Sequence, residues 1–262
     1  MANNVEFFNW KLNSSNPVTA MNVCYGKLKK VRIPDIHSAI HIGMIRQGEN
    51  RGRFGKDELS FTAGELYLTA PWEPHNTIES NGASLLLVTL DTRSLEDFFT
   101  NCKENLFSLF RMSPAQRMVY INARDGLYDC TKKILDTVAE NPTPIQKLQL
   151  WHAVLEIFIN ILPENPENIP VNDDSRRLLP LLEKLGNRMI SLDEAARLCN
   201  LSPSRFSVLF KNFSGLSFGR YERNFRLNGA AGAIRRGATL KEAAIEWDFC
   251  DKSHLARLLK NF

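Results

Sequence analysis

Three histidines and two aromatic side chains in the first third of the chain have the types and spacing that could bind a ligand. His37 and His41 are four residues apart, so their side chains point the same way if the segment is one strand. His75 follows on a later predicted strand, shortly after Tyr67 and Trp72. Imidazole nitrogens bind transition metals, but such a set can equally line a pocket for a small molecule or simply fill a core.

The segment that carries these residues has the pattern of β-structure. Across residues 31–91, short alternating or apolar runs are separated by Gly and Pro, and residues 84–90 form the near-continuous apolar run of a buried strand. Many short strands with such turns predict a small β-barrel or jelly roll. Helical periodicity follows over residues 94–162, so helices should flank the barrel.

Residues 64–71 (Gly-Glu-Leu-Tyr-Leu-Thr-Ala-Pro), followed by His75, resemble the second cupin motif. Cupin enzymes hold a metal with an H-x-H pair and a Glu in addition to the later His. Here the spacing is His37-x-x-x-His41, and no Glu stands at the expected offset. We therefore expect no metal, no cofactor and no catalytic residue. We expect a barrel whose interior takes a small molecule, lined by His37, His41, Tyr67, Trp72 and His75.

The C-terminal third is basic. From Arg176 onward, sixteen Lys and Arg stand against eight Asp and Glu, a balance of +8. The remaining seventeen and twenty-one give −4, which together make the formal net charge of +4. A basic module on a mildly acidic remainder favours nucleic-acid binding over a merely solvated surface.

The same region contains an internal repeat of one structural pattern. Residues 191–196 (Ser-Leu-Asp-Glu-Ala-Ala) return 48 positions later as residues 239–244 (Thr-Leu-Lys-Glu-Ala-Ala). Each copy opens with the Ser/Thr-x-x-Glu pattern of a capping box, and its Ala pair lets a second helix cross closely. Asn200 and Asp248, types that tolerate positive φ, mark the turns.

A second helix follows each turn, beginning with Ser202-Pro203 in one copy and Asp251 in the other. The sequence therefore predicts two helix-turn-helix units, joined by a linking helix from Ser217 to about Arg236.

This tandem arrangement resembles the DNA-binding domain of the AraC/XylS family of bacterial transcription regulators, over about residues 176–262. The matching residues are Leu201 to Ser204, Phe206, Ser207, Phe210, Lys211, Gly215, Ser217, Phe218, Tyr221, Arg226, Leu227, Ala230, Phe249, Asp251, Ser253, Arg257 and Lys260. The chain departs from the family pattern at Asp248, where Gly is usual, and at His254, Leu255 and Leu259, where aromatic residues are usual. Family members also continue past the position of Phe262, so either the protein is naturally short or the sequence is truncated there.

The resemblance implies that the second helix of each unit lies in the major groove, with the two helices about 34 Å apart on one face of the DNA. The expected DNA contacts are Ser204, Arg205, Val208, Lys211, Lys252, Ser253, His254, Arg257 and Lys260. Arg257 is the expected base contact, because guanidinium pairs bidentately with guanine, and Lys211 and Lys260 should meet phosphate. The expected core residues are Phe206, Leu209, Phe210, Leu255 and Leu258.

Pro144 opens a long predicted helix, residues 144–162, which is apolar on more than one side. Such a helix packs against its own domain and against something else, and in similar regulators the partner is the same helix of a second subunit. We expect a homodimer through this helix; the alternative is a helix buried within one chain. Residues 163–175, rich in Pro, Asn and acids, read as an exposed linker.

Five scattered cysteines, Cys24, Cys102, Cys130, Cys199 and Cys250, argue against a disulfide framework or a structural zinc site and for a reducing cytosol. No apolar stretch reaches the roughly 18 residues that a membrane helix needs, and the N-terminus lacks a signal-peptide core. We therefore expect a cytoplasmic protein without a membrane partner.

The sequence thus predicts two domains. Residues 1–162 form a cupin-like effector-sensing and dimerisation domain, residues 163–175 a linker, and residues 176–262 an all-α DNA-binding domain. We expect a transcription activator rather than an enzyme, with double-stranded DNA, a small-molecule effector and RNA polymerase as partners. Two alternatives stay open: a regulator that responds to a protein partner and no small molecule, and a metal-dependent cupin enzyme with a helical appendage.

Overall fold

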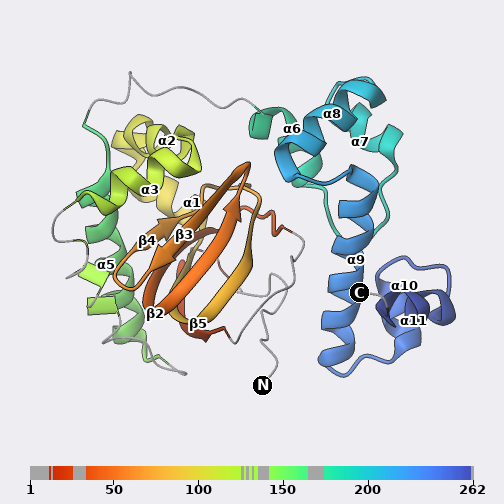
Figure 1. Cartoon of the computed structure of the whole chain (residues 1–262), viewed down its shortest axis with the longest axis horizontal. Coiled ribbons are helices and arrows are strands. Elements are labelled where there is room, and N and C mark those ends of the chain that lie inside the picture. The colour runs from red at the N-terminus through yellow and green to blue at the C-terminus, as the bar shows by residue number, and fades with distance from the viewer. Residues whose placement is uncertain are drawn as a thin grey trace. The chain divides into compact units, whose positions relative to one another are not determined.

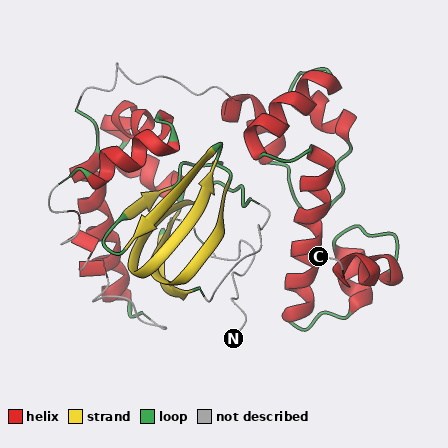
Figure 2. Ribbon diagram, viewed as in Figure 1, coloured by secondary structure: helices red, strands yellow, loops and turns green. Residues whose placement is uncertain are grey.

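The structure, a computed structural model, divides into two compact units between Asn172 and Asp173. Residues 12, 14–25, 34–124, 127, 130, 131, 133, 134, 142–164 and 174–260 are described. The first unit combines one antiparallel sheet with helices, and the second is helical throughout (Figure 2). Each predicted secondary-structure class is therefore confirmed, whereas most of the predicted linker lies outside the described residues.

The sheet of the first unit has five strands: β1 (Val18–Cys24), β2 (Ile40–Phe54), β3 (Asp57–Thr62), β4 (Leu66–Leu68) and β5 (His75–Leu90). The strand order is β1-β5-β2-β3, with β4 also paired to β2, and every pairing is antiparallel. Figure 1 shows the long β2 and β5 side by side at its centre.

The antiparallel pair of strands β2 and β5 curls until its two ends meet. His75 pairs with Phe54 and His41 pairs with Thr89, so in a flat pair of strands His41 and His75 would lie thirteen residues, or about 40 Å, apart. Yet the backbones of Asp35 and His75 exchange two hydrogen bonds of 2.8 and 3.0 Å. Three register shifts in the β2–β5 pairing supply bends of the kind that β-bulges produce. Closure into a full cupin barrel stays a prediction.

Helices α1 (Thr92–Phe98), α2 (Lys103–Arg111), α3 (Pro114–Asn122) and α5 (Pro144–Ile161) belong to the first unit. Figure 1 shows α2, α3 and α5 along one side of the sheet. Sheet and helices share one apolar core, to which α5 contributes seven buried residues. Helix α5 begins at Pro144, as predicted, behind a capping box of Thr143 and Gln146.

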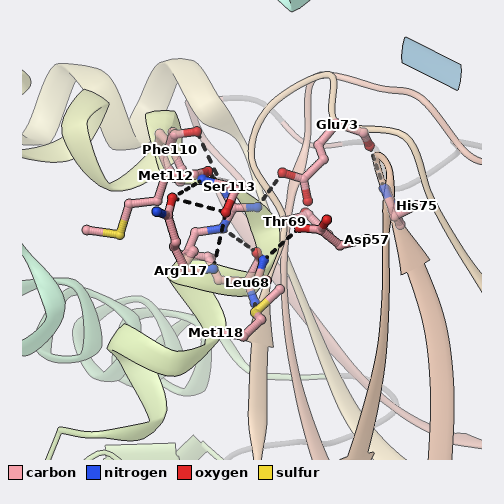
Figure 3. A network of polar contacts seen from close by, with 12 residues as sticks. Asp57, Leu68, Thr69, Glu73, His75, Phe110, Met112, Ser113, Arg117 and Met118 are labelled. Atoms are coloured by element: carbon pink, nitrogen blue, oxygen red, sulfur yellow. Dashed lines mark hydrogen bonds and ion pairs between the residues drawn. The ribbon is translucent and has the colours of Figure 1, made fainter. Parts of the chain in front are cut away.

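A buried arginine joins α3 to the turn that precedes β5 (Figure 3). The Arg117 side chain is fully buried and forms an ion pair with Glu73. Its Nε donates to the carbonyl of Leu68 at 2.9 Å, and its Nη1 donates to the carbonyls of Phe110 and Met112 at 3.3 Å. The network therefore fixes the polypeptide that leads directly to His75.

The second unit consists of α6 (Asp174–Leu182), α7 (Leu192–Leu198), α8 (Pro203–Ser214), α9 (Phe218–Arg235), α10 (Leu240–Glu246) and α11 (Lys252–Lys260). The predicted linking helix is confirmed as α9. Among the described residues, no helix is both long and apolar enough to cross a membrane.

Candidate functional site

Two helical pairs, α7–α8 and α10–α11, have the turns that the sequence predicts. Asn200 has φ of 53° and Asp248 has φ of 55°, so both non-glycine residues occupy the left-handed region. The second helices are capped as expected, because Ser202 accepts a hydrogen bond from the Arg205 amide and Asp251 accepts one from the His254 amide. The two pairs therefore share one local geometry.

The first helices of the two pairs differ at their caps. Thr239 and Glu242 form the full reciprocal capping box. Ser191 accepts from the Glu194 amide at 3.2 Å, but the Glu194 carboxylate bonds to Arg188 at 2.5 Å instead of reaching back. The predicted box at Ser191 is thus half formed, since a nearby guanidinium offers the carboxylate a stronger, charged partner.

The exposed faces of α8 and α11 carry most of the residues expected to contact DNA. On α8, the side chains of Ser204, Arg205, Val208 and Lys211 are exposed. On α11, Lys252, Ser253, Arg257 and Lys260 are exposed. The opposite faces are buried as predicted at Phe206, Phe210 and Leu255, while Leu209 and Leu258 are half-buried. Each helix therefore presents a polar and largely basic face to solvent.

His254 is the member of the predicted contact set that does not lie on the exposed face. Its side chain is half-buried, and its ring packs edge-on against Phe249 at a centroid distance of 6.1 Å. Its Nδ1 is buried and has no hydrogen-bond partner among the described residues. The ring replaces the aromatic residue usual here and packs in a similar way, which the resemblance alone did not reveal.

An open hollow of about 440 Å³ lies where α10 and α11 begin. It is lined by Thr239, Leu240, Lys241, Lys252, Ser253 and Ala256. Helix N-termini and lysine side chains both favour a negatively charged group.

A buried ion pair on α9 connects the two helical pairs. Glu222 and Arg226 are 6% exposed each, and the Arg226 Nε donates to the Glu222 carboxylate at 2.6 Å. Glu222 also accepts from the Ile190 amide, just before α7, at 3.4 Å. Arg226 donates through Nη1 to the carbonyls of Trp247 and Asp248 at 3.1 and 2.8 Å. This one ion pair is thus hydrogen-bonded both to the backbone before α7 and to the backbone after α10.

Asp248 adds a second link between the pairs. Its carboxylate accepts a hydrogen bond of 2.9 Å from the amide of Met189. The glycine usual at this turn would supply the positive φ but no such acceptor. The departure at Asp248 is therefore explained by a contact that only a side chain can make.

Close packing brings α10 against α9. A Cβ built on Gly229 would lie 2.1 Å from the Trp247 ring, so no side chain fits at this position. The indole, placed by the C-terminal end of α10, therefore rests directly on the backbone of α9. This contact, like Glu222, was missed from the sequence, which shows an i,i+4 charge pair and a helical glycine without saying that either is buried.

In the first unit, the three predicted pocket histidines come together. His37, His41 and His75 have ring centroids 4.8 to 5.2 Å apart, and the first two are buried. Burial lowers the pKa of each; that of His75 falls to about 4. All three are therefore neutral at pH 7.

The two aromatic residues predicted to line the pocket, Tyr67 and Trp72, have different surroundings. Tyr67 is buried among Phe54 and Phe61, with ring centroids 5.4 and 5.5 Å away, and burial raises the pKa of its hydroxyl. Trp72 is half-buried at a positive φ of 62°, where its amide donates to the carbonyl of His37. Tyr67 thus belongs to an aromatic cluster, and Trp72 to the turn beside the histidines.

Comparisons with known proteins agree with this arrangement. A helix-turn-helix domain family matches residues 195–262. The XylDLEGF operon transcriptional activator 1 of Pseudomonas putida is 22% identical over 254 residues, which cover 92% of this chain and 76% of that protein. A second XylDLEGF operon transcriptional activator from the same organism matches equally, at 22% over 254 residues.

Two solved structures have a similar fold over both units. ToxT from Vibrio cholerae O395, bound to (E)-4-(8-methylnaphthalen-1-yl)but-3-enoic acid, matches with a TM-score of 0.54 at 9% identity, over 93% of this chain and 94% of that one. Another ToxT structure from Vibrio cholerae matches with a TM-score of 0.53 at 10% identity and the same coverage.

The fold, the exposed basic helix and the domain match define a helix-turn-helix transcription regulator. Together with the relatives over nearly the whole chain, they support a resemblance to the AraC/XylS family of regulators.

We predict that Arg226→Ala destabilises the second unit by about 3–5 kcal/mol, because it leaves the buried Glu222 carboxylate without its partner. Arg223→Ala, at an exposed position of the same helix, should change the free energy of unfolding by less than about 0.5 kcal/mol. Urea unfolding of both variants measures this. Equal stability of the two variants would show that the ion pair does not hold the unit together.

Proposed function

We propose that this protein is a sequence-specific transcription activator in which both helical pairs bind DNA. Helices α8 and α11 each enter a major groove, and the two grooves are one helical turn apart. The observation that carries the proposal is the linkage through α9: one helix, one buried ion pair and one Asp248–Met189 hydrogen bond hold two similar pairs together. A protein that used a single pair would have no need of this linkage.

The nine residues expected to contact DNA have different proposed roles, according to where each lies on its helix. Arg257, exposed on α11, is the proposed base-reading residue. Lys211 and Lys260, near the C-terminal ends of their helices, are proposed phosphate contacts, as is Lys252 beside the hollow at the start of α11. Ser204, Arg205, Val208 and Ser253 complete the exposed faces, and His254 supports α11 from its inner side.

The first unit is the proposed sensor. A cupin-like barrel with an interior that takes a small molecule agrees with the curled pair of strands β2 and β5 and with the similar fold of ToxT, one structure of which holds an aromatic alkenoic acid. The alternative, a regulator that responds to a protein partner and no small molecule, is tested below. We further propose that the protein acts in the cytoplasm, where it would contact RNA polymerase at the promoter.

The exposed face of α5 is the proposed dimer interface. Ile145, Leu148 and Ile159 are 63 to 69% exposed, while the other side of the helix is buried in the core. Their spacing of three and eleven residues places them along one stripe. A second copy of the same helix fits this stripe, since a two-fold axis would bring its three exposed apolar side chains against the same three of the second copy.

Selection from random duplex DNA tests the DNA-binding proposal. We expect a site with two half-motifs about one helical turn apart. Arg257→Ala should lower affinity for that site by about 1–3 kcal/mol and relax one base position, whereas Lys211→Ala should weaken all sequences alike. Arg223→Ala, outside both recognition helices, is the matched control. A site with a single half-motif would refute the use of both pairs.

A titration tests the sensor proposal. We expect an aromatic alkenoic acid of the kind bound in the ToxT structure to change the affinity for the selected DNA site by about 5–150-fold, and DNA to change affinity for the acid by the same factor. DNA binding that is insensitive to such acids would favour the protein-partner alternative.

The dimer proposal is tested by charge in the apolar stripe. Leu148→Glu should convert a dimer into a monomer in analytical ultracentrifugation, because a carboxylate would be buried at the interface without a partner. Val119→Glu, on α3 and 73% exposed, should leave the oligomeric state unchanged. A wild-type monomer at micromolar concentration would refute the interface.

A further inference from the structure

Three histidines from two segments meet where the curled pair of strands β2 and β5 closes. His37 precedes β2, His41 lies near the start of β2, and His75 begins β5. Each ring offers a nitrogen, and these nitrogens lie within 4.8 Å of one another. His37 and His41 are 7% and 5% exposed, so the cluster is shielded from bulk water.

The hydrogen bonds of the outer ring nitrogens orient the inner ones. The Nδ1 of His37 lies 3.0 Å from the carbonyl of Ala39, and the Nδ1 of His75 lies 2.8 Å from the carbonyl of Glu73. A carbonyl only accepts, so both Nδ1 atoms carry the proton and both Nε2 atoms keep a lone pair. The Nδ1 of His41 faces the Thr89 hydroxyl at 3.0 Å. Histidines that bind a metal through one ring nitrogen usually have such a hydrogen bond at the other ring nitrogen.

The separation of the Nε2 atoms of His37 and His41 fits a metal ion. The Nε2 atoms of His37 and His41 are 3.2 Å apart. Two nitrogens at about 2.0–2.1 Å from a tetrahedral zinc ion are about 3.3 Å apart.

We propose that the Nε2 atoms of His37, His41 and His75 bind one divalent transition-metal ion, with Zn²⁺ as the reference ion. A set of three imidazoles suits zinc and its neighbours in the first transition row, whereas Mg²⁺ and Ca²⁺ require oxygen ligands. Three protein ligands leave one position open for water or an anionic donor. This proposal replaces the expectation of no metal, which rested on the cupin spacing and on the missing Glu.

One feature of the surroundings supports the proposal. Glu73, whose carbonyl accepts from His75, is itself held by the buried Arg117 (Figure 3). The third ligand is therefore fixed by the framework rather than by the ion.

A metal-free arrangement competes with this one. If the Thr89 hydroxyl donates to the Nδ1 of His41, the Nε2 of His41 carries the proton and can donate to the Nε2 of His37. That chain of hydrogen bonds stabilises two of the three rings without an ion. The two arrangements differ in whether the folded protein takes up metal with defined stoichiometry.

The test uses the full chain, stripped with a chelator and titrated with Zn²⁺ by calorimetry and with Co²⁺ by visible absorption. We expect one ion per chain, the absorption of four-coordinate Co²⁺, and a melting temperature that rises with ion concentration. His37→Gln and His75→Gln should each lower the affinity about 100-fold, and Thr89→Val, which removes only an orienting contact, about 10-fold. His152→Gln and His254→Gln, at the two histidines outside the cluster, should leave it unchanged.

Circular dichroism checks that each variant is folded, and Thr89→Val keeps the test usable if a histidine variant is not. Failure of the folded wild-type chain to bind Zn²⁺ or Co²⁺ stoichiometrically would overturn the proposal and favour the hydrogen-bonded chain. Binding that survives in His37→Gln and His75→Gln but disappears on alkylation of the cysteines would overturn it as well, because the ion would then be held by thiolates.

Discussion

A buried guanidinium must find acceptors for five N–H donors, and in this protein that requirement ties distant segments together in both units. Arg226 bonds to Glu222 and to two carbonyls at the end of α10. Arg117 bonds to Glu73 and to three carbonyls of the first unit. Because an arginine cannot lose its proton, neither segment can move away without leaving a charge buried and unpaired.

For DNA binding, the important consequence is that the two helical pairs are not independent. The Glu222 carboxylate reaches the backbone before α7, and the Arg226 guanidinium reaches the backbone after α10. The Trp247 indole rests on Gly229, which adds apolar contact to the polar link. The spacing between α8 and α11 is thus set by short-range contacts to α9 and is less dependent on the loops, as the proposed binding of two half-motifs at fixed separation requires.

Local features of the second unit could be predicted because they depend on a few neighbouring residues. The positive φ of Asn200 and Asp248 follows from residue types that tolerate the left-handed region. The caps at Ser202 and Asp251 follow from side chains that bond to the nearest backbone. The burial of Glu222 could not be predicted in this way. An i,i+4 charge pair on a helix is usually exposed, and only the tertiary packing shows that this one is not.

The histidine cluster is a second case in which tertiary structure decided what the sequence could not. His37, His41 and His75 were expected in one place and their rings do lie together, but the cupin spacing and the missing Glu argued against a metal. His37 precedes β2, so strand parity does not govern its direction. His75 comes close to His41 only because the paired strands β2 and β5 curl over thirteen residues. No local sequence pattern encodes that curl.

The curl also places the histidines next to a segment that contacts α1. The histidines lie where the start of β2 meets the start of β5, and the Thr92 hydroxyl at the start of α1 donates to the carbonyl of Ser38, between His37 and His41. A ligand or ion at the cluster therefore contacts the same short segment that α1 contacts. Such a ligand changes the arrangement of the helices only if it binds one closure of this strand pair more tightly than another. The buried Arg117–Glu73 pair limits that freedom at His75, so any movement would have to come from the segment that carries His37 and His41.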